Sequence, residues 1–448
     1  MWKKTNSKVV ENMDHKKNML EIVKSRHLRV GVVGLGYVGL PLAVEFAQND
    51  VCVLAFDTAK ERVAKINSGE NYISDVNTER LTELVQTKKL SATSDFKELG
   101  SCNAIFICVP TPLDKFRKPD MSFIEEACIA IGKNIKKGTF ISLESTTYPT
   151  TTEDFVLPII EKESGLKEGI DFWLAYSPER VDPGNKAFST KNTPKVLGAL
   201  SSDGLIIGKS IYQLAVDEVH TVSSPRIAEM VKILENTYRL VNISLINELA
   251  LLAGKMDINI WEVIEAAATK PFGFQAFYPG PGVGGHCIPL DPFYLEHIAK
   301  KFNFDLSMIH TAGHIDLLMA HRMTVKITSA LNRHKKAING SKILFLGVAY
   351  KSDINDERES PALKIMEEVL KKGGNVKYHD PFISKIETQQ GHVLNSVDLD
   401  KERLKLADCV VITTNHSVFD ADFIEEHAQL IVDLRNMIKE ASDKVYKL

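Results

Sequence analysis

Residues 28–57 read LRVGVVGLGYVGLPLAVEFAQNDVCVLAFD. Two apolar runs, at 28–33 and 51–56, flank a segment of helical length. Short apolar runs separated in this way are typical of a strand, a helix and a second strand. Because a crossover helix joins strands that run in the same direction, this stretch predicts a βαβ unit and an α/β fold.

The turn after the first run carries Gly34, Gly36 and Gly39 in the pattern G-x-G-x-x-G, with Tyr37 and Val38 between the last two glycines. Glycines at these positions allow a tight turn and let backbone amides approach a ligand closely. The N-terminus of the helix that follows favours negative charge. The motif therefore predicts a site for the pyrophosphate of a dinucleotide, with all five residues as candidate cofactor contacts.

Asp57 ends the second run, 18 residues beyond Gly39. A carboxylate there accepts hydrogen bonds from the adenosine ribose and repels a 2′-phosphate, so it predicts NAD rather than NADP. The alternative is a simple turn residue at the end of a strand. Arg62 is a further candidate cofactor contact because its charge could favour a phosphate, although its position is also typical of a solvated helix face.

The remaining chain continues the alternation of strands and helices. Further apolar runs lie at 104–109, 139–143 and 172–176. A long helix is expected over 224–255, and a loop rich in Gly and Pro covers 271–292. After His334 the strand pattern restarts, and a second acid at the end of a strand follows at Asp380. Such a pattern predicts two Rossmann-like domains, each a doubly wound parallel sheet, joined by a central helical domain.

The expected domain boundaries follow from this pattern. They are 1–27 for an N-terminal leader, 28–210 for an NAD-binding Rossmann domain, 211–334 for a central helical domain and 335–448 for a C-terminal Rossmann-like domain.

Composition excludes several classes of protein. The 55 basic and 58 acidic residues give a net charge of −3, so no global field favours nucleic acid or an anionic membrane. The polar leader lacks the apolar core of a signal peptide, and no stretch reaches the length of a membrane span. Six cysteines without metal-site spacing predict no metal site and a cytoplasmic protein; Cys52, Cys102, Cys108 and Cys409 are expected to be buried in apolar strands.

Cys287 differs from these cysteines because it follows the glycine loop GPGVGGH at 280–286, and Asp291 lies four residues further on. The glycines let the loop approach a phosphate, and a thiolate is a good nucleophile towards a carbonyl. The alternative is a loop cysteine without chemistry. His286 is interpreted as part of the loop rather than as a base.

Seven motifs occur in one order along the chain: GLGYVGLP (34–41), VPTP (109–112), ESTTYP (144–149), YSPERVDPG (176–184), KILEN (232–236), GVGGHCIPLD (282–291) and GVAYKSDINDERES (347–360). With these motifs the chain after residue 28 resembles the UDP-glucose/UDP-N-acetylhexosamine 6-dehydrogenases. The resemblance implies oxidation of C6 of a UDP-sugar to a carboxylate with two NAD⁺, through a thiohemiacetal and a thioester on Cys287.

The resemblance also implies that the helical domain 211–334 carries the active site and the dimer contact and that the C-terminal domain 335–448 binds UDP. It implies roles for other residues as well. Lys232 stabilises the oxyanion at C6, Asn236 helps to position it, Asp291 and Thr147 orient water and move protons, and Glu179 is a general base in thioester hydrolysis. Glu179 could alternatively form a surface ion pair. Tyr278, Gly282, Gly284, Gly285, Lys351 and Arg435 match positions that hold UDP or its sugar, whereas Thr111, Thr147 and Arg358 match cofactor contacts. For Lys351 and Arg435 the alternative is a solvated surface charge.

The sugar is suggested by the residues after the Pro-Glu pair. Relatives that act on UDP-glucose carry Phe-Leu and an acid there, whereas this chain reads PERVDPGN at 178–185. This departure resembles the N-acetylhexosamine branch, in which Arg180 and Val181 are candidate substrate contacts. UDP-GlcNAc is the first expectation, with UDP-ManNAc and UDP-glucose as alternatives, because a few contacts decide between such sugars.

Two other classes remain open on sequence alone. A β-hydroxyacid dehydrogenase also joins an NAD domain to a helical domain, but it lacks the loop that ends at Cys287 and the third α/β domain. A scaffold that has lost the chemistry would not need Lys232, Asn236 and Asp291.

If the long helix exposes an apolar stripe, a second copy of the chain is expected to cover it. The product would serve capsule, O-antigen or other polysaccharide synthesis.

Overall fold

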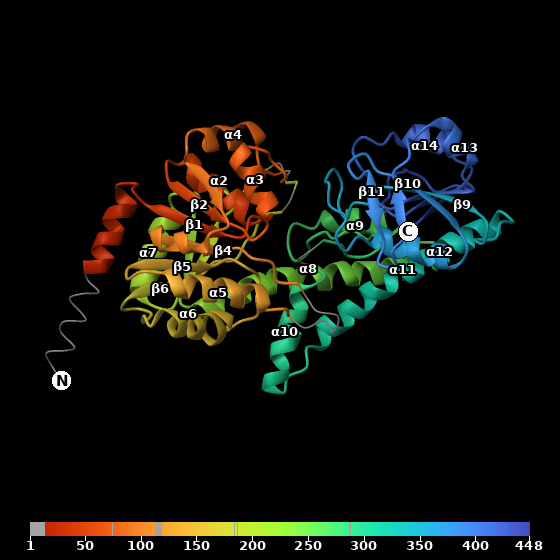
Figure 1. Cartoon of the computed structure of the whole chain (residues 1–448). Coiled ribbons are helices and arrows are strands. Elements are labelled where there is room, and N and C mark those ends of the chain that lie inside the picture. The colour runs from red at the N-terminus through yellow and green to blue at the C-terminus, as the bar shows by residue number, and fades with distance from the viewer. Residues whose placement is uncertain (1–13, 74, 113–118, 183, 186, 286–287) are drawn as a thin grey trace. The chain divides into compact units, whose positions relative to one another are not determined.

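The computed structural model describes residues 14–448 except 74, 113–118, 183, 186 and 286–287. The chain divides into two compact units, shown in Figure 1. Unit 1 comprises Met1–Glu235 and Phe293–Asn303, and unit 2 comprises Asn236–Pro292 and Phe304–Leu448. Each unit contains a largely parallel sheet with helices, and the long helix α8 (Pro225–Ala253) links them, so the predicted fold class is confirmed.

Unit 1 is built on an eight-stranded sheet in the order β3-β2-β1-β4-β5-β6-β7-β8. The strands are β1 (Arg29–Val33), β2 (Cys52–Phe56), β3 (Leu90–Thr93), β4 (Ala104–Ile107), β5 (Thr139–Leu143), β6 (Phe172–Tyr176), β7 (Lys195–Ala199) and β8 (Val219–Val222). All neighbouring pairs are parallel except β6 and β7. The order reverses between β1 and β4, which is where ligands bind at the carboxyl ends of such sheets.

The helices of unit 1 follow the strands in sequence. They are α2 (Gly39–Gln48), α3 (Lys60–Ser68), α4 (Thr78–Gln86), η1 (Phe96–Ser101), α5 (Ser122–Asn134), η2 (Thr152–Val156), α6 (Leu157–Ser164) and α7 (Ser202–Tyr212), and the returning segment adds α10 (Asp291–Ala299) and η3 (Lys300–Phe302).

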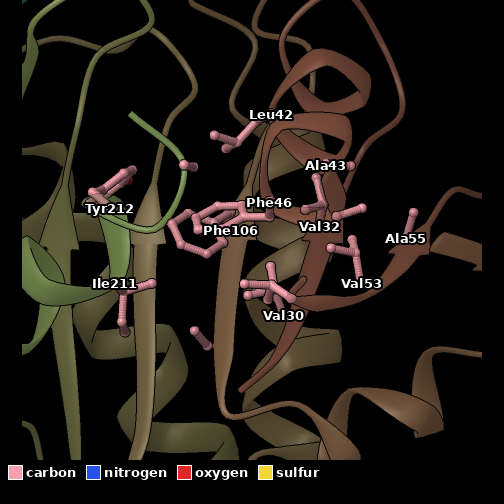
Figure 2. Close-up of a cluster of buried hydrophobic side chains, with 14 of the residues drawn as sticks. Val30, Val32, Leu42, Ala43, Phe46, Val53, Ala55, Phe106, Ile211 and Tyr212 are labelled. Atoms are coloured by element: carbon pink, nitrogen blue, oxygen red, sulfur yellow. The ribbon is translucent and has the colours of Figure 1, made fainter. Parts of the chain in front are cut away.

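The sheet of unit 1 is buried on both faces because alternate residues of each strand enter different cores. Val30, Val32 and Phe106 pack with α2 and α7 in the core drawn in Figure 2. There the rings of Phe46 and Phe106 lie 5.0 Å apart. The intervening Ile105 enters a second core with α5 and α6. Continuous apolar strands are therefore explained by two-sided burial.

Unit 2 holds a five-stranded, fully parallel sheet in the order β10-β9-β13-β14-β15 and a separate antiparallel pair, β11 with β12. Its strands are β9 (Lys342–Leu346), β10 (Asn375–His379), β11 (Lys385–Glu387), β12 (Val393–Asn395), β13 (Cys409–Ile412), β14 (Ile431–Asp433) and β15 (Val445–Lys447), and its further helices are α9 (Ile260–Ala268), α11 (Ser307–Arg333), α12 (Pro361–Lys371), α13 (Lys401–Leu406) and α14 (Ala421–His427). Two cores again cover the two faces of the sheet.

Part of the expected leader is a helix over 14–24. Its Met19 and Val23 are buried in the first core of unit 1, and Lys16 forms an ion pair with Asp203. This part of the leader is therefore packed structure. No helix among the described residues is long and apolar enough to cross a membrane.

One prediction about the cysteines is wrong. Cys102, Cys108 and Cys409 are buried as expected, but Cys52 is exposed. Cys52 is the first residue of β2, and the burial of that strand begins only at the next residue. An apolar run therefore does not bury the residue at its end.

Candidate active site

The three glycines of the first turn have three different local roles. Gly34 has a φ of +97°, and a Cβ there would lie 2.6 Å from the carbonyl oxygen of Cys108. A Cβ on Gly39 would lie 1.9 Å from the carbonyl oxygen of Gly34, so the helix approaches the strand closely. A Cβ on Gly36 would meet nothing within 4 Å, which leaves space over the loop. This arrangement fits a bound pyrophosphate.

Asp57 lies directly after β2 and holds the glycine loop. Its Oδ2 accepts a hydrogen bond from the amide of Leu35 (3.0 Å), and its Oδ1 accepts one from Ala59 (2.8 Å). The half-exposed Arg62 lies 3.5 Å from Oδ2. Tyr72, which the sequence did not suggest, donates to the Leu35 carbonyl at 2.8 Å. A carboxylate has about four acceptor positions, so Asp57 keeps capacity for a ribose.

Two threonines of the predicted site follow neighbouring strands of unit 1. Thr111 follows β4 and is buried, and its carbonyl accepts a hydrogen bond from Tyr294. Thr147 follows β5 and is fully buried, and its Oγ1 has no hydrogen-bond partner among the described residues. A buried hydroxyl without a partner is costly, and it suits a site where a water or substrate completes the hydrogen bonds.

Glu179 lies on the loop after β6 and is held at several atoms. Its Oε1 accepts hydrogen bonds from the amides of Arg180 (2.8 Å) and Val181 (2.9 Å). Its backbone carbonyl accepts one from Nζ of the buried Lys232 on α8, at 2.6 Å. The structure therefore brings Lys232 to the Glu179 loop, as the predicted site requires.

Arg180 is not free to reach a ligand in this geometry. Its guanidinium forms an ion pair of 2.7 Å with Glu235 and donates to the carbonyl of Pro194 at 2.7 Å. A substrate contact from Arg180 stays a prediction.

In unit 2, Asn236 and Asp291 meet directly. Nδ2 of Asn236 on α8 donates to Oδ2 of Asp291, the first residue of α10, at 2.5 Å. Both side chains are buried. Lys232 lies one turn earlier on the same helix. Cys287 and His286 lie outside the described residues.

The glycine loop that precedes Cys287 is tied to its own unit. The amide of Gly280 donates to Asn247 at 2.9 Å, and that of Gly285 donates to the carbonyl of Arg358 at 3.0 Å. Gly282 and Gly285 have positive φ values of +141° and +87°. A Cβ on Gly284 would lie 2.6 Å from the Cβ of Tyr350. These positions require glycine for conformation or for space.

The predicted UDP-binding cation Arg435 lies against this loop. A Cβ on Gly280 would lie 2.5 Å from Nη1 of Arg435, and Nε of Arg435 donates to the carbonyl of Thr413 at 2.9 Å. Burial lowers the pKa of Arg435 to about 10. A partly buried guanidinium beside a glycine backbone is suited to a phosphate, since the anion restores the lost solvation of the cation.

The other predicted ligands of unit 2 have different surroundings. Arg358 forms an ion pair with Asp356 at 2.6 Å. Tyr278 is half-exposed, and its ring stacks on Trp261 with centroids 5.8 Å apart. Lys351 is partly buried in the loop after β9. Their contacts with a ligand stay predictions.

The buried thiols are poor nucleophiles. Burial raises the pKa of Cys102 to about 11 and raises the pKa values of Cys108, Cys128 and Cys409 further. A thiol must ionise to attack a carbonyl. Of the described cysteines, only Cys52 is exposed, and it lies on a strand end without a neighbouring predicted site residue.

Some residues of unit 1 were missed because they looked structural in the sequence. Glu144 and Lys195 form a buried ion pair at 2.6 Å next to Glu179. The available signal was a lysine at the start of the strand KVLGA and a glutamate directly after the strand TFISL, since charges beside buried strands need partners.

Comparison with known proteins identifies relatives along most of the chain. Three family models of the UDP-glucose/GDP-mannose dehydrogenase family match: the NAD-binding domain at 28–216, the central domain at 226–316 and the UDP-binding domain at 344–440. The chain is 34% identical over 395 residues to a UDP-N-acetyl-D-glucosamine 6-dehydrogenase of Pseudomonas aeruginosa, with 88% of this chain and 92% of the relative covered.

A second relative acts on the epimeric sugar. The chain is 35% identical over 419 residues to a UDP-N-acetyl-D-mannosamine dehydrogenase of Pyrococcus horikoshii, with 92% of this chain and 96% of the relative covered. The solved structure of a UDP-D-ManNAc dehydrogenase from that organism matches with a TM-score of 0.85 and 33% identity, over 94% of this chain and 99% of that chain.

Proposed function

Because the chain belongs to the UDP-glucose/GDP-mannose dehydrogenase family and is an NAD-dependent UDP-sugar dehydrogenase, we propose that it oxidises C6 of UDP-N-acetylglucosamine to the carboxylate. The observation that carries the proposal is the buried hydrogen bond between Asn236 and Asp291. It joins the residue assigned to the reacting carbon to the residue assigned to the water, and an ordinary core would not need this polar pair.

The chemistry balances over two oxidations. NAD⁺ supplies the hydride acceptor for both. The C6 alcohol loses a hydride and a proton to give an aldehyde, and the Cys287 thiolate adds to it as a thiohemiacetal. Loss of a second hydride and proton gives a thioester, and water cleaves the carbon–sulfur bond to release the carboxylate and the thiol.

The other residues serve charge and proton transfer in this proposal. Lys232 stabilises negative charge on the C6 oxygen, and Asn236 orients it. Asp291 and Thr147 hold the water, and Glu179 acts as the base for hydrolysis. The hydroxyl of Thr147 has no hydrogen-bond partner in the part of the chain that the structure describes, which supports a role that a bound molecule completes.

The sugar and the nucleophile are tested together. Wild type is incubated with NAD⁺ and UDP-GlcNAc, UDP-ManNAc or UDP-glucose, and the NADH formed per sugar is measured for wild type, Cys287→Ala and the control Cys52→Ala. We expect two NADH per UDP-GlcNAc for wild type and for the control, and loss of turnover in Cys287→Ala. A preference for UDP-ManNAc would move the assignment to the epimer, and an active Cys287→Ala would remove the thioester.

We propose a homodimer through helix α8. Its exposed apolar residues recur at intervals of three, four or seven and therefore share one face: Ile227, Met230, Leu234, Tyr238, Leu245, Leu249, Leu252 and, just beyond the helix, Met256. An apolar stripe of this length is costly in water, and a symmetric copy presents the same stripe. The free, mostly buried thiols also fit a reducing cytoplasm.

The dimer is tested by charge on the stripe. Leu245→Glu with Leu249→Glu should give a monomer in size-exclusion chromatography with light scattering. Leu406→Glu is the control, because Leu406 is also an exposed leucine but lies on α13. A dimer that survives the double substitution would place the contact elsewhere.

A further inference from the structure

Unit 1 contains a buried lysine that is shared by two carboxylates. Nζ of Lys195, at the start of β7, lies 2.6 Å from Oε2 of Glu144 and 3.1 Å from Oε2 of Glu179. The Lys195 side chain is 4% exposed, that of Glu144 is fully buried, and that of Glu179 is 13% exposed. This cluster is thus among the most deeply buried charges of the unit.

The second carboxylate oxygen of Glu144, Oε1, also has a hydrogen-bond partner. The hydroxyl of Tyr212, at the end of α7, donates to Oε1 of Glu144 and is itself within 2.8 Å of Oγ of Ser142. The backbone of Lys195 sits in the antiparallel neighbour of β6, the strand that leads into the Glu179 loop. The cluster therefore connects β5, β7 and α7 to the end of β6.

Stability alone does not account for this arrangement. Moving charges out of water costs several kcal/mol for each ion, and apolar side chains of similar volume are often as stable. A buried ion pair is thus weak evidence for a purely structural role. Its position beside Glu179 offers another explanation.

The contacts of Glu179 show what Lys195 adds. Oε1 is fixed by the amides of Arg180 and Val181, and Oε2 is fixed by Lys195, so the carboxylate cannot rotate without losing a partner. The carbonyl of the same residue receives Lys232. Glu179 therefore contributes two groups to the site. Its side-chain carboxylate is held by Lys195, and its backbone carbonyl accepts a hydrogen bond from Lys232, the proposed oxyanion-stabilising lysine.

We propose that Lys195, anchored by Glu144, is a positioning residue that fixes the Glu179 carboxylate for the hydrolysis step. The inference rests on the proposed function, which assigns that step to Glu179. Lys195 itself touches no reacting atom. Its effect passes through one hydrogen bond, from Nζ to Oε2 of Glu179.

The charge states agree with this role. Burial alone would raise the pKa of Glu179, but Lys195, the amide of Val181 and Lys232 hold it below its ordinary value. Burial raises the pKa of Glu144 to about 7 despite the opposing charge of Lys195. Burial would lower the pKa of Lys195, but the two carboxylates raise it. Glu179 is thereby held ionised, the charge state that a general base must have before it accepts a proton.

The test separates positioning from charge balance. Pre-steady-state NADH formation and steady-state kinetics with the sugar that wild type uses are measured for Lys195→Met, Lys195→Arg and Glu179→Gln. Two double variants are also measured: Lys195→Met with Glu179→Gln, and the charge-neutral double variant Lys195→Met with Glu144→Gln, which leaves the net charge of the cluster unchanged. Lys16→Met is the matched control, since it removes a 2.6 Å ion pair with Asp203 in the same unit without touching Glu179.

For Lys195→Met we expect a burst of two NADH per subunit and then steady turnover slower by about 10- to 100-fold, with a KM that falls together with kcat because the thioester accumulates. Lys195→Arg should recover part of the rate because it keeps the charge and a donor. Combination of Lys195→Met with Glu179→Gln should add no further loss, since both act on one step. The charge-neutral double variant should be folded but still slow.

Wild-type turnover in the charge-neutral double variant, or losses that add fully with Glu179→Gln, would overturn the positioning role while leaving the proposed function intact. Absence of NADH from wild type with every UDP-sugar is a different result, and it would overturn the proposed function together with this inference.

Discussion

The two α/β units each place an aspartate at the end of the second strand of their first βαβ unit, but the two carboxylates are used differently. Asp57 accepts amide hydrogen bonds from Leu35 and Ala59 and lies 3.5 Å from Arg62. Asp380 accepts five: from the amides of Val348, Ala349, Phe382 and Ile383 and from Nε2 of His416.

The side chain of His416 contributes to this difference between the two aspartates. It is fully buried, and its Nδ1 accepts a hydrogen bond from the amide of Asp353 at 3.0 Å. Nε2 must therefore carry the proton that it shares with Asp380, so a neutral ring satisfies both partners. Asp380 has no acceptor position to spare, whereas Asp57 has. A shared topology thus leaves acceptor capacity on the aspartate of unit 1, whereas internal hydrogen bonds use that of the aspartate in unit 2.

The largest expected effect comes from Asp380→Ala, which leaves five buried donors without their acceptor. We expect a loss of about 3–5 kcal/mol in the free energy of unfolding of unit 2. Hydrogen exchange in β9 and β13 should accelerate strongly, while that in β1 and β4 should not. Unchanged protection of β9 would contradict the structural role of Asp380.

Asp57→Ala should have its main effect on the cofactor. Loss of a charged acceptor for the ribose is worth about 1.5–3 kcal/mol, or roughly 10- to 100-fold in NAD⁺ affinity. The preference for NAD⁺ over NADP⁺ should fall because the repulsion of a 2′-phosphate is removed. Calorimetric titration with both cofactors measures this, and UDP binding is the control. Equal loss of UDP affinity would mean that Asp57 is structural like Asp380.

The stability of unit 2 should also depend on acid. Burial would raise the pKa of Asp380, but His416 and the amides of Val348 and Phe382 hold it below its ordinary value. A lowered folded-state pKa stabilises the protein above the ordinary value and loses that contribution as the pH falls below it. Acid denaturation of wild type and Asp380→Asn should therefore converge below about pH 4. A constant difference at all pH values would refute this.

The smallest effect is expected for Arg62→Ala. The guanidinium is half-exposed and 3.5 Å from Asp57, and such pairs contribute about 0–1 kcal/mol. Unfolding and NAD⁺ affinity should change little. In the Asp57→Ala background, Arg62 should support NADP⁺ binding, so removal of both side chains should abolish that gain. A gain that persists without Arg62 would point to another phosphate contact.

Much of the fold could be predicted because its strands are apolar on both faces. The strands Thr139–Leu143 and Phe172–Tyr176 and the helix Pro225–Ala253 lie where the sequence places them, within about two residues. The reversed direction of β7 could not be predicted, since an apolar run carries no sign of its partner's direction. The edge strand Leu90–Thr93 was missed because its sequence LSAT alternates apolar and polar residues and lacks the continuous apolar run of a strand such as Ala104–Ile107.

The site was less accessible to sequence reasoning. Gly34, Gly36 and Asp57 could be found because their conformation and spacing follow from the chemistry of a pyrophosphate turn. The pairing of Glu144 with Lys195 could not, because the residues are 51 positions apart and only the sheet brings them together. Charges that look solvated in a sequence need the tertiary structure to reveal their partners.

The division of the chain has a consequence for its synthesis. Unit 1 stops at Glu235 and resumes at Phe293–Asn303, which carries the Tyr294 hydroxyl to Thr111. A ribosome that adds about 5–20 residues per second needs roughly 3–14 s to make the 68 residues from Asn236 to Asn303. During that time the nascent NAD-binding unit waits for its last segment, so a slow codon or a chaperone acting there would affect its completion before unit 2 exists in full.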